Sequence, residues 1–329
     1  METSSTLREL WDTTRMRLLV EIERQGSVSA AAAAIGIGQP SASQHLRLLE
    51  TAAGQRLVER TGRGSRLTGA GQVLAARAAQ ALMSLGAAEE ELGALAGLQT
   101  GTIHLGASTA PGVYLLPDTL GCFRRSYPGV SVEVEVAASD DILGRLLAGR
   151  VQLAIVGAVE ADERIELTPF LEDEIVGIAS PGVLPLRNGR LAIARLSEFM
   201  LLSRERGSSS QLFVDRELQA AGAAPAGVWE LGSSEAIKRA AREGLGVAFL
   251  SRYAVAEEVE RGDVECFRLA GRPPLVREFS VARLAGRPLS PAEETFVETL
   301  TSCCAKQAHY AEACVGSRRS SSPKRARAT

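Results

Sequence analysis

Residues that can contact nucleic acid gather in one short part of this sequence. Gln39 and Gln44 each offer a hydrogen-bond donor and an acceptor, the combination that matches the edge of adenine in the major groove of DNA. Ser41 and Ser43 lie between them, and a serine hydroxyl can bind either a base or a phosphate. This spacing predicts a base-reading segment if the four residues lie on an exposed helix that fits a groove.

Arginines dominate the residues that follow this segment. They can neutralise phosphates, which would make binding weaken as the salt concentration rises; they are Arg47, Arg56, Arg60, Arg63 and Arg66. Only Glu50 and Glu59 oppose them here, although the whole chain of 329 residues has a formal net charge of -2. A protein that is basic overall is thereby excluded, but a local basic surface is predicted.

Two helices and a tight turn are expected to precede the base-reading segment. Gly26 can end the first helix in a left-handed conformation, and Ser27 can cap the second, which is the alanine run from Ala30 to Ala34. The third helix opens at Gln39-Pro40, with proline at the tolerated first turn, and runs to about residue 53.

One face of that third helix is expected to be buried, because Ala42, Leu46 and Leu49 are spaced four and three residues apart. Residues 55–67 then predict a short hairpin, or wing. The pattern by itself leaves two interpretations open. One is a DNA-binding helix-turn-helix, and the other is a solvated helical hairpin with an arginine-rich loop.

A long helix is predicted from Gly69 to Ala96, with Thr68 as its cap. Its small and apolar residues recur in steps of four and three, a seven-residue period that indicates a coiled-coil seam between two chains. The seam residues are Leu74, Ala78, Ala81, Leu85, Ala88, Leu92 and Leu95. Residues 97–101 form the expected hinge to the rest of the chain.

Strands and helices alternate beyond this hinge, which predicts a parallel sheet covered on both faces. The expected strands are 102–108, 130–137, 151–157, 174–179, 200–203, 247–250 and 277–284. The expected helices are 115–126, 140–148, 211–221, 234–243 and 291–303. From about residue 316 the chain is basic and of low complexity, and we expect this tail to be disordered.

Several functions find no support in the residues. The five cysteines are scattered without a CxxC pair, which argues against a disulfide framework or a zinc site. His45, His104 and His309 belong to no catalytic pattern, so we expect no enzyme. The first residues do not resemble a signal peptide, and no apolar run approaches a membrane span, so a cytoplasmic location is expected. A solute-binding module without DNA binding is the remaining alternative.

The stretch from Met16 to about Gly71 resembles the winged-helix signature of LysR-type transcriptional regulators. The resemblance rests on GSVSAAAAAIGIGQPSASQHLRLLE and on GQRLVERTGRGSRLTGAG. It implies a sequence-specific DNA-binding regulator. The residues that it places against bases are Gln39, Pro40, Ser41, Ser43 and Gln44, and those against phosphates are Arg47, Arg60 and Arg63. Gly38 and Gln44 depart from the Ser and Arg usual in the family, so the preferred DNA sequence is not implied.

The order of the later elements resembles the same family to about residue 300. It implies an α/β fold with a winged helix-turn-helix at 1–67, a dimerising linker helix at 68–98 and a two-lobed effector-binding domain at 101–304, which is similar to periplasmic solute-binding proteins. Lobe I would comprise 101–172 and 275–304, and lobe II 173–274. Residues 305–329 would form a C-terminal extension.

The resemblance also implies a ligand site between the lobes, since ligands of such sheets bind beyond the carboxyl ends of the strands. The residues expected there are Ser108, Thr109, Ser203, Ser208, Ser209, Ser210, Ser233 and Phe249. Hydroxyl and backbone N–H groups at helix starts can hold an anion, so we expect a small anionic metabolite and no cofactor. Each serine can equally be a helix cap.

Residues 203–210 (SRERGSSS) resemble the RExGSGTR segment of regulators of carbon fixation and sulfur assimilation in this family. Ser209, Ser210 and Gln211 replace its last three residues, so a shared ligand is not implied. The expected partners are double-stranded DNA with a palindromic promoter site, a small anionic metabolite and further copies of the chain. The linker helix implies a homodimer, the family a tetramer, and RNA polymerase is a further candidate. Ligand closure of the lobes would alter the bend in the DNA.

Overall fold

The computed structural model describes residues 12–62, 64–95, 101–160, 162–205 and 208–311. Three helices open the chain, and they are α2 (Thr13–Gln25), α3 (Val28–Ala34) and α4 (Gln39–Ala53). Asp12 caps α2 by accepting a hydrogen bond from the Arg15 N–H at 3.0 Å, and Ser27 caps α3. Gly26 ends α2 in the left-handed region with a φ of 65°. The helix-turn-helix expected from the sequence is confirmed.

The wing is an antiparallel hairpin of β1 (Val58–Thr61) and β2 (Gly64–Leu67). Glu50, near the end of α4, anchors it by accepting hydrogen bonds from the N–H groups of Leu57 and Val58 at 3.0 and 3.3 Å. A glycine is required at Gly71, because a Cβ there would overlap the Leu57 carbonyl oxygen. The wing therefore lies against both the end of α4 and the start of the next helix.

Helix α5 (Gly69–Leu95) follows, and the Thr68 hydroxyl caps it by accepting from the Gly71 N–H at 3.1 Å. Leu85 and Leu92 in its second half are 49% and 68% exposed. Ala78 is buried within its own chain at 1% exposure, so its expected place in a seam between two chains is wrong. The reason is that α2 and lobe I pack against the half of α5 that contains Ala78.

Lobe I is built on three parallel strands, β3 (Gly101–Ser108), β4 (Val130–Ala137) and β5 (Leu153–Val156), in the order β4-β3-β5. Its helices are α6 (Thr109–Tyr114), α7 (Leu116–Ser126), α8 (Ser139–Leu147) and α12 (Pro291–Ala311). Leu153 and Ile155 join one core with Phe123 and Phe296, and Ala154 joins the other core. Both faces of the sheet are thus covered, as expected.

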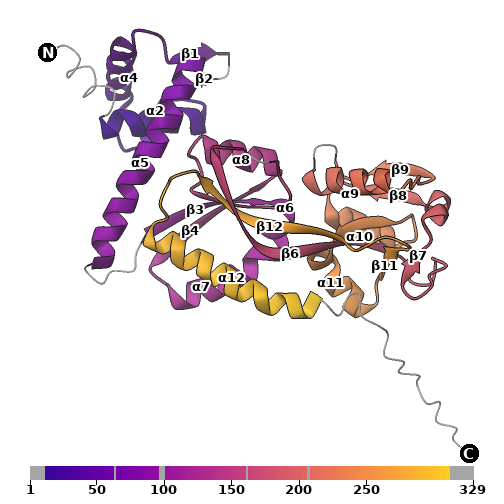
Figure 1. The fold of residues 1–329 in the computed structure, drawn as a ribbon. Helices are drawn as coiled ribbons and strands as arrows, with labels where there is room; N and C mark the ends of the chain where they lie inside the picture. The colour runs from indigo at the N-terminus through magenta and orange to yellow at the C-terminus, as the bar shows by residue number, and fades with distance from the viewer. Residues whose placement is uncertain (1–11, 63, 96–100, 161, 206–207, 312–329) are drawn as a thin grey trace, which may run out of the picture.

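Two long antiparallel strands connect the lobes and cross the middle of the molecule (Figure 1). They are β6 (Ile165–Ala179) and β12 (Leu275–Leu284). The sequence prediction began the first of these only at Glu174, since Pro169 interrupts the residues before it and a proline within a run argues against a strand. Pairing with β12 gives the backbone of those residues its hydrogen-bond partners.

Lobe II differs from the expected parallel sheet. β10 (Ala248–Ser251) and β11 (Glu265–Leu269) both run antiparallel to β6. The parallel pairs of this lobe lie further out, and they are β8 (Met200–Ser203) with β9 (Gly227–Glu230) and β11 with the short β7 (Arg190–Leu191). The remaining elements are η1 (Ile193–Glu198), α9 (Ser209–Ala220), α10 (Ser234–Arg242) and α11 (Arg252–Arg261).

The closing helix α12 reaches Ala311, eight residues beyond its expected end at Cys303, since the added segment contains no Gly or Pro and several good helix formers. The basic tail from about 316 lies outside the described residues.

Replacing Gly177 of β6 with alanine should lower the free energy of unfolding by about 1–3 kcal/mol, the usual range for overpacking a core. Its Cβ would overlap the buried ring of Phe267 on the neighbouring strand. Gly144→Ala is the matched control, because this exposed glycine of α8 has nothing within 4 Å of the added Cβ. The midpoint of urea unfolding measures both, and equal midpoints would contradict the prediction.

Candidate nucleic-acid interface and anion cavity

The outer face of α4 carries the residues expected to read DNA. Gln39, Pro40, Gln44 and Arg47 are exposed, while Ser41 and Ser43 are half-buried. Ala42 and Leu49 point into the core of the N-terminal domain. Gly38 is the N-cap of α4 and supplies no side-chain hydrogen bond, which leaves the first N–H groups of this helix available to a phosphate.

The arginines of this region fall into two groups. Arg56 pairs with Glu50 at 3.3 Å, and Arg66 pairs with Glu59 at 2.6 Å. Arg47 and Arg60 are exposed and form no ion pair with any described residue. Arg63 lies outside the described residues. Arg47 and Arg60 are thus the described cations of this surface whose charge is not already compensated.

Five of the eight residues expected at the ligand site surround one small cavity between the lobes. Ser108 and Thr109 come from the end of β3 in lobe I, and Ser208, Ser209 and Ser210 come from the start of α9 in lobe II. The cavity is completed by Ala110, Ala138, Ser139, Arg204, Glu205 and Arg277. Its volume is about 20 Å³, which is enough for about one water molecule.

The other three expected residues lie elsewhere. Ser203 lines a second hollow, between α9 and β9, which we call the hollow behind α9. Ser233 is exposed and caps α10 by accepting from the Ala236 N–H at 3.2 Å. Phe249 is 5% exposed in the core of lobe II, where its ring packs against that of Phe267. Ser203 ends β8 and Ser233 caps α10, as the sequence indicated, but only the fold decides which strand ends and helix starts meet at the cavity.

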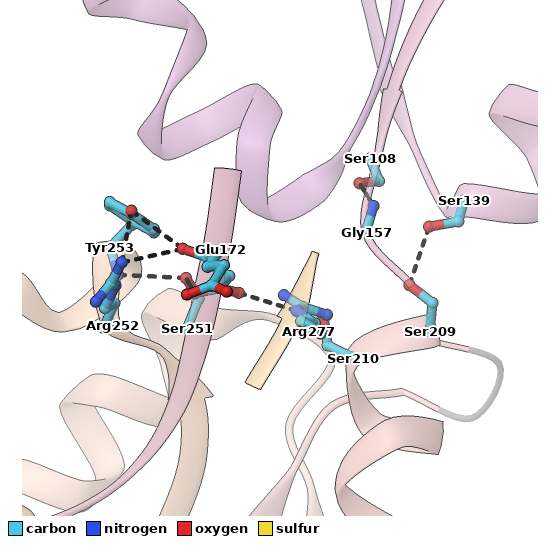
Figure 2. Close-up of polar contacts among 11 residues, drawn as sticks. Ser108, Ser139, Gly157, Glu172, Ser209, Ser210, Ser251, Arg252, Tyr253 and Arg277 are labelled. Carbon is cyan, nitrogen blue, oxygen red and sulfur yellow. Dashed lines mark hydrogen bonds and ion pairs between the residues drawn. The ribbon is translucent and has the colours of Figure 1, made fainter. Parts of the chain in front are cut away.

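A direct hydrogen bond joins the two lobes across the cavity (Figure 2). The hydroxyls of Ser139 and Ser209 lie 2.9 Å apart. Each residue is the first of its helix, and neither helix has a side-chain hydrogen bond at its N-cap. The free N–H groups and the positive ends of α8 and α9 therefore meet at this cavity and favour an anion there.

Arg277 of β12 and Asp173 of β6 lie opposite each other in this antiparallel pair and form a buried ion pair. The Arg277 Nε lies 2.9 Å from an Asp173 carboxylate oxygen, and the two side chains are 2% and 0% exposed. Burial raises the pKa of Asp173, while the charge of Arg277 and a hydrogen bond from Ser251 act against that rise. Arg277 also donates to the Ser210 hydroxyl at 2.8 Å.

One donor of Arg277 is left over. Its Nη2 is buried and has no hydrogen-bond partner among the described residues, although the side chain lines the cavity. Such a group is costly unless a ligand or water accepts from it. Sequence analysis missed Arg277 as a site residue. The usable signal was an arginine near the start of a strand that returns from lobe II to lobe I.

Arg204 is the second buried cation at the cavity, and sequence analysis missed it as well. Its Nε and Nη2 donate to the two carboxylate oxygens of Glu205 at 2.8 and 2.6 Å. Its Nη1 donates to the Ser234 hydroxyl at 3.2 Å. Burial alone would raise the pKa of Glu205, but the hydrogen bonds and the charge of Arg204 hold it below its usual range.

The hollow behind α9 is larger, at about 630 Å³, and shares Arg204 with the cavity. Asp215 and Glu230 also line it, so its charge does not favour an anion. A further contact between the lobes involves Tyr114 of α6, whose hydroxyl donates to Glu235 of α10 at 2.9 Å. Burial raises the pKa of this tyrosine to about 12.

The described parts of the chain hold no group of three or more His, Cys, Asp or Glu residues that could bind a metal ion. No helix within the same ranges is long and apolar enough to cross a membrane.

Asp173→Asn should lower the free energy of unfolding by about 3–5 kcal/mol, because it leaves the Arg277 charge buried and uncompensated. The double variant Asp173→Asn/Arg277→Met should recover part of that loss, since no isolated charge remains. Denaturant unfolding of the two single variants, Asp173→Asn and Arg277→Met, and of the double variant measures the coupling between the two side chains. A double variant that loses the sum of the two single losses would show that the pair contributes nothing as a pair.

Comparison with known proteins identifies the two parts of the chain. Residues 13–72 match the bacterial regulatory helix-turn-helix protein of the lysR family, and residues 96–305 match the LysR substrate binding domain. The HTH-type transcriptional activator CmpR of Synechocystis sp. is 30% identical over 286 residues, which covers 87% of this chain and 93% of CmpR.

Two solved structures are similar in fold. A full-length OxyR variant from Pseudomonas aeruginosa has a TM-score of 0.71 at 22% identity and covers 89% of this chain and 94% of its own. The regulatory domain of CcmR from Synechocystis PCC6803 in complex with 2-PG has a TM-score of 0.57 at 29% identity and covers 62% of this chain and 97% of its own. The curated relatives are transcriptional regulators rather than enzymes. The chain therefore belongs to the LysR-type transcriptional regulators, which join a DNA-binding helix-turn-helix to an effector-binding domain.

Proposed function

We propose that this regulator responds to a small anion bound in the cavity between its lobes. The observation that carries the proposal is the set of unused donors there. These are the buried Nη2 of Arg277 and the first N–H groups of α8 and α9. CcmR, whose regulatory domain has been solved with 2-PG, is similar to this chain over the effector-binding half. This similarity supports an effector site in the same half of our protein.

The DNA-binding role is assigned to the α4 face and the wing. Gln39, Pro40, Ser41, Ser43 and Gln44 read base edges, and the phosphate contacts are made by Arg47, Arg60 and Arg63. The exposure of Gln39, Gln44, Arg47 and Arg60 supports this assignment. We assign residues 1–67 to this domain, 68–98 to the linker helix, 101–304 to the effector domain and 305–329 to an extension.

Assembly follows from the exposed part of α5. Leu85 and Leu92, together with Ala81 and Ala88, present an apolar stripe to a second chain. A two-fold dimer then requires a palindromic promoter site, and further contacts between effector domains would give the tetramer. The regulator acts in the cytoplasm, where its DNA lies, and RNA polymerase is a further partner.

Lobe I touches the DNA-binding part directly, which provides a physical route from ligand to DNA. Arg150 of lobe I pairs with Glu23 of α2 at 3.0 Å. Next to it, Gly149 lies so close to Ala79 and Met83 of α5 that a Cβ would come within 2.9 Å of the Ala79 side chain. A ligand that changes the position of lobe I would therefore change the position of the helix-turn-helix. Such a change requires unequal affinity for two arrangements.

Arg60→Ala should weaken binding to every DNA sequence and reduce the slope of log affinity against log salt by about 1, because one phosphate contact is lost. Gel-shift titrations over a range of salt concentrations measure this. Arg242→Ala removes the same charge from α10 in lobe II and should leave the slope unchanged. An unchanged slope for Arg60→Ala would remove this residue from the phosphate contacts.

Calorimetry with 2-PG, inorganic phosphate and acetate should detect binding of at least one of these anions, with no binding of glycerol. The reason is that the cavity offers hydrogen-bond donors and positive helix ends. Footprinting on promoter DNA should then show a changed protected span when the bound anion is saturating. Binding of neutral ligands only would refute an anionic effector, and an identical footprint would refute the coupling to DNA.

A further inference from the structure

The cavity between the lobes contains two arginines, and each already has a carboxylate partner. Arg277 is paired with Asp173, and Arg204 is paired with Glu205. The four charges sum to zero, so these side chains give the cavity no net charge to attract an anion. Any anion that binds must therefore gain from donors that are unused or replace one of the two carboxylates.

The two carboxylates differ in how firmly they are held. Asp173 is 0% exposed and receives hydrogen bonds from both Arg277 and Ser251, at 2.9 and 2.7 Å. The side chain of Glu205 is 40% exposed, whereas that of Arg204 is 8% exposed. A rotation about the side-chain bonds of Glu205 can bring its carboxylate into water, but Asp173 has no such route.

Arg204 remains in place when Glu205 leaves. Its Nη1 donates to Ser234, and its backbone N–H donates to the Gln211 side chain at 3.0 Å. The two donors that Glu205 now occupies, Nε and Nη2, form the planar fork that binds carboxylates and phosphates in two-point fashion. The Glu205 carboxylate thus has the chemistry and the position of a ligand anion.

The small volume of the cavity also indicates that the Glu205 side chain moves when an anion binds. A volume of about 20 Å³ is enough for about one water molecule, so a carboxylate or phosphate gains room there when a lining side chain moves. Of the charged groups that line the cavity in the described chain, only Glu205 is both acidic and partly exposed. When the Glu205 carboxylate rotates away, space opens in the cavity and the Arg204 guanidinium loses its partner.

We propose that Glu205 is an internal competitor of the effector, and that an acidic group of the ligand displaces it from Arg204 and also accepts from the free Nη2 of Arg277. This inference rests on the proposed anion site and adds a mechanism of selection. A ligand must carry an anionic group with at least two oxygens, such as a carboxylate or a phosphate, because a neutral group cannot replace the Arg204–Glu205 pair. Neutral compounds are rejected by this competition.

The test is the affinity of the full-length protein and of Glu205→Gln for inorganic phosphate and for 2-PG, measured by calorimetry. Glutamine keeps the size of the side chain but removes the competing charge, so the dissociation constant should fall about fivefold, the upper end for a single partly exposed ion pair. Glu243→Gln is the matched control. Glu243 also pairs with the arginine that precedes it, Arg242, at 3.5 Å, but lies outside the cavity.

The outcomes separate the two proposals. If neither the wild type nor Glu205→Gln binds any anion, the anion site itself is refuted, and the inference with it. If the wild type binds and Glu205→Gln binds equally or more weakly, the anion site stands and the competition is refuted. A crystal structure of the wild type with the bound anion gives a check that needs no variant. Glu205 should be turned away from Arg204, and an intact pair beside the anion would overturn the inference.

Discussion

The ion pair between Asp173 and Arg277 is the interaction on which the two-lobed arrangement depends. It joins neighbouring residues of the antiparallel strands β6 and β12, which connect the lobes, and both side chains are almost completely buried. A charge pair in such a place is costly to break, because either partner alone would be stranded away from water. The pair therefore holds β6 and β12 in one register and places the Arg277 guanidinium at the cavity. The same guanidinium donates to Ser210 at the start of α9, so that the connecting strands, lobe II and the cavity are joined through one side chain.

Contacts away from β6 and β12 also hold the two lobes together. Ser139 and Ser209 meet across the cavity, and Tyr114 of lobe I bonds to Glu235 of lobe II. With a cavity of about 20 Å³, the described arrangement of the lobes is closed. A ligand of this protein must therefore exchange existing polar contacts rather than enter an open cleft. Its effect on the lobes depends on the difference between the contacts that it removes and those that it makes.

The DNA-binding part packs directly against lobe I of the effector domain. The turn at Gly149 and Arg150 packs on α5 and pairs with Glu23 of α2, and only a glycine permits so close an approach to Ala79. This contact uses one side of α5 within the chain, whereas Leu85 and Leu92 are exposed. It also explains why a regular heptad pattern misplaced Ala78. A period of seven shows which residues share a helix face, but not whether that face meets the same chain or another one.

Much of this protein could be predicted from local sequence alone. The caps at Asp12, Ser27 and Thr68 and the stop at Gly26 depend on residues a few positions apart, so the helix-turn-helix and the long helix were correct. The positions of the serines at the starts of α6 and α9 were likewise predicted, because strand ends and helix starts are local features. Only the tertiary structure decided which distant groups meet them. The contacts of Arg204 with Ser234 and of Arg277 with Asp173, and the burial of Phe249 in the core of lobe II, all depend on strand direction and on the pairing of β6 with β12. The Arg277 pairing joins residues 104 positions apart, and no periodicity within either segment records it.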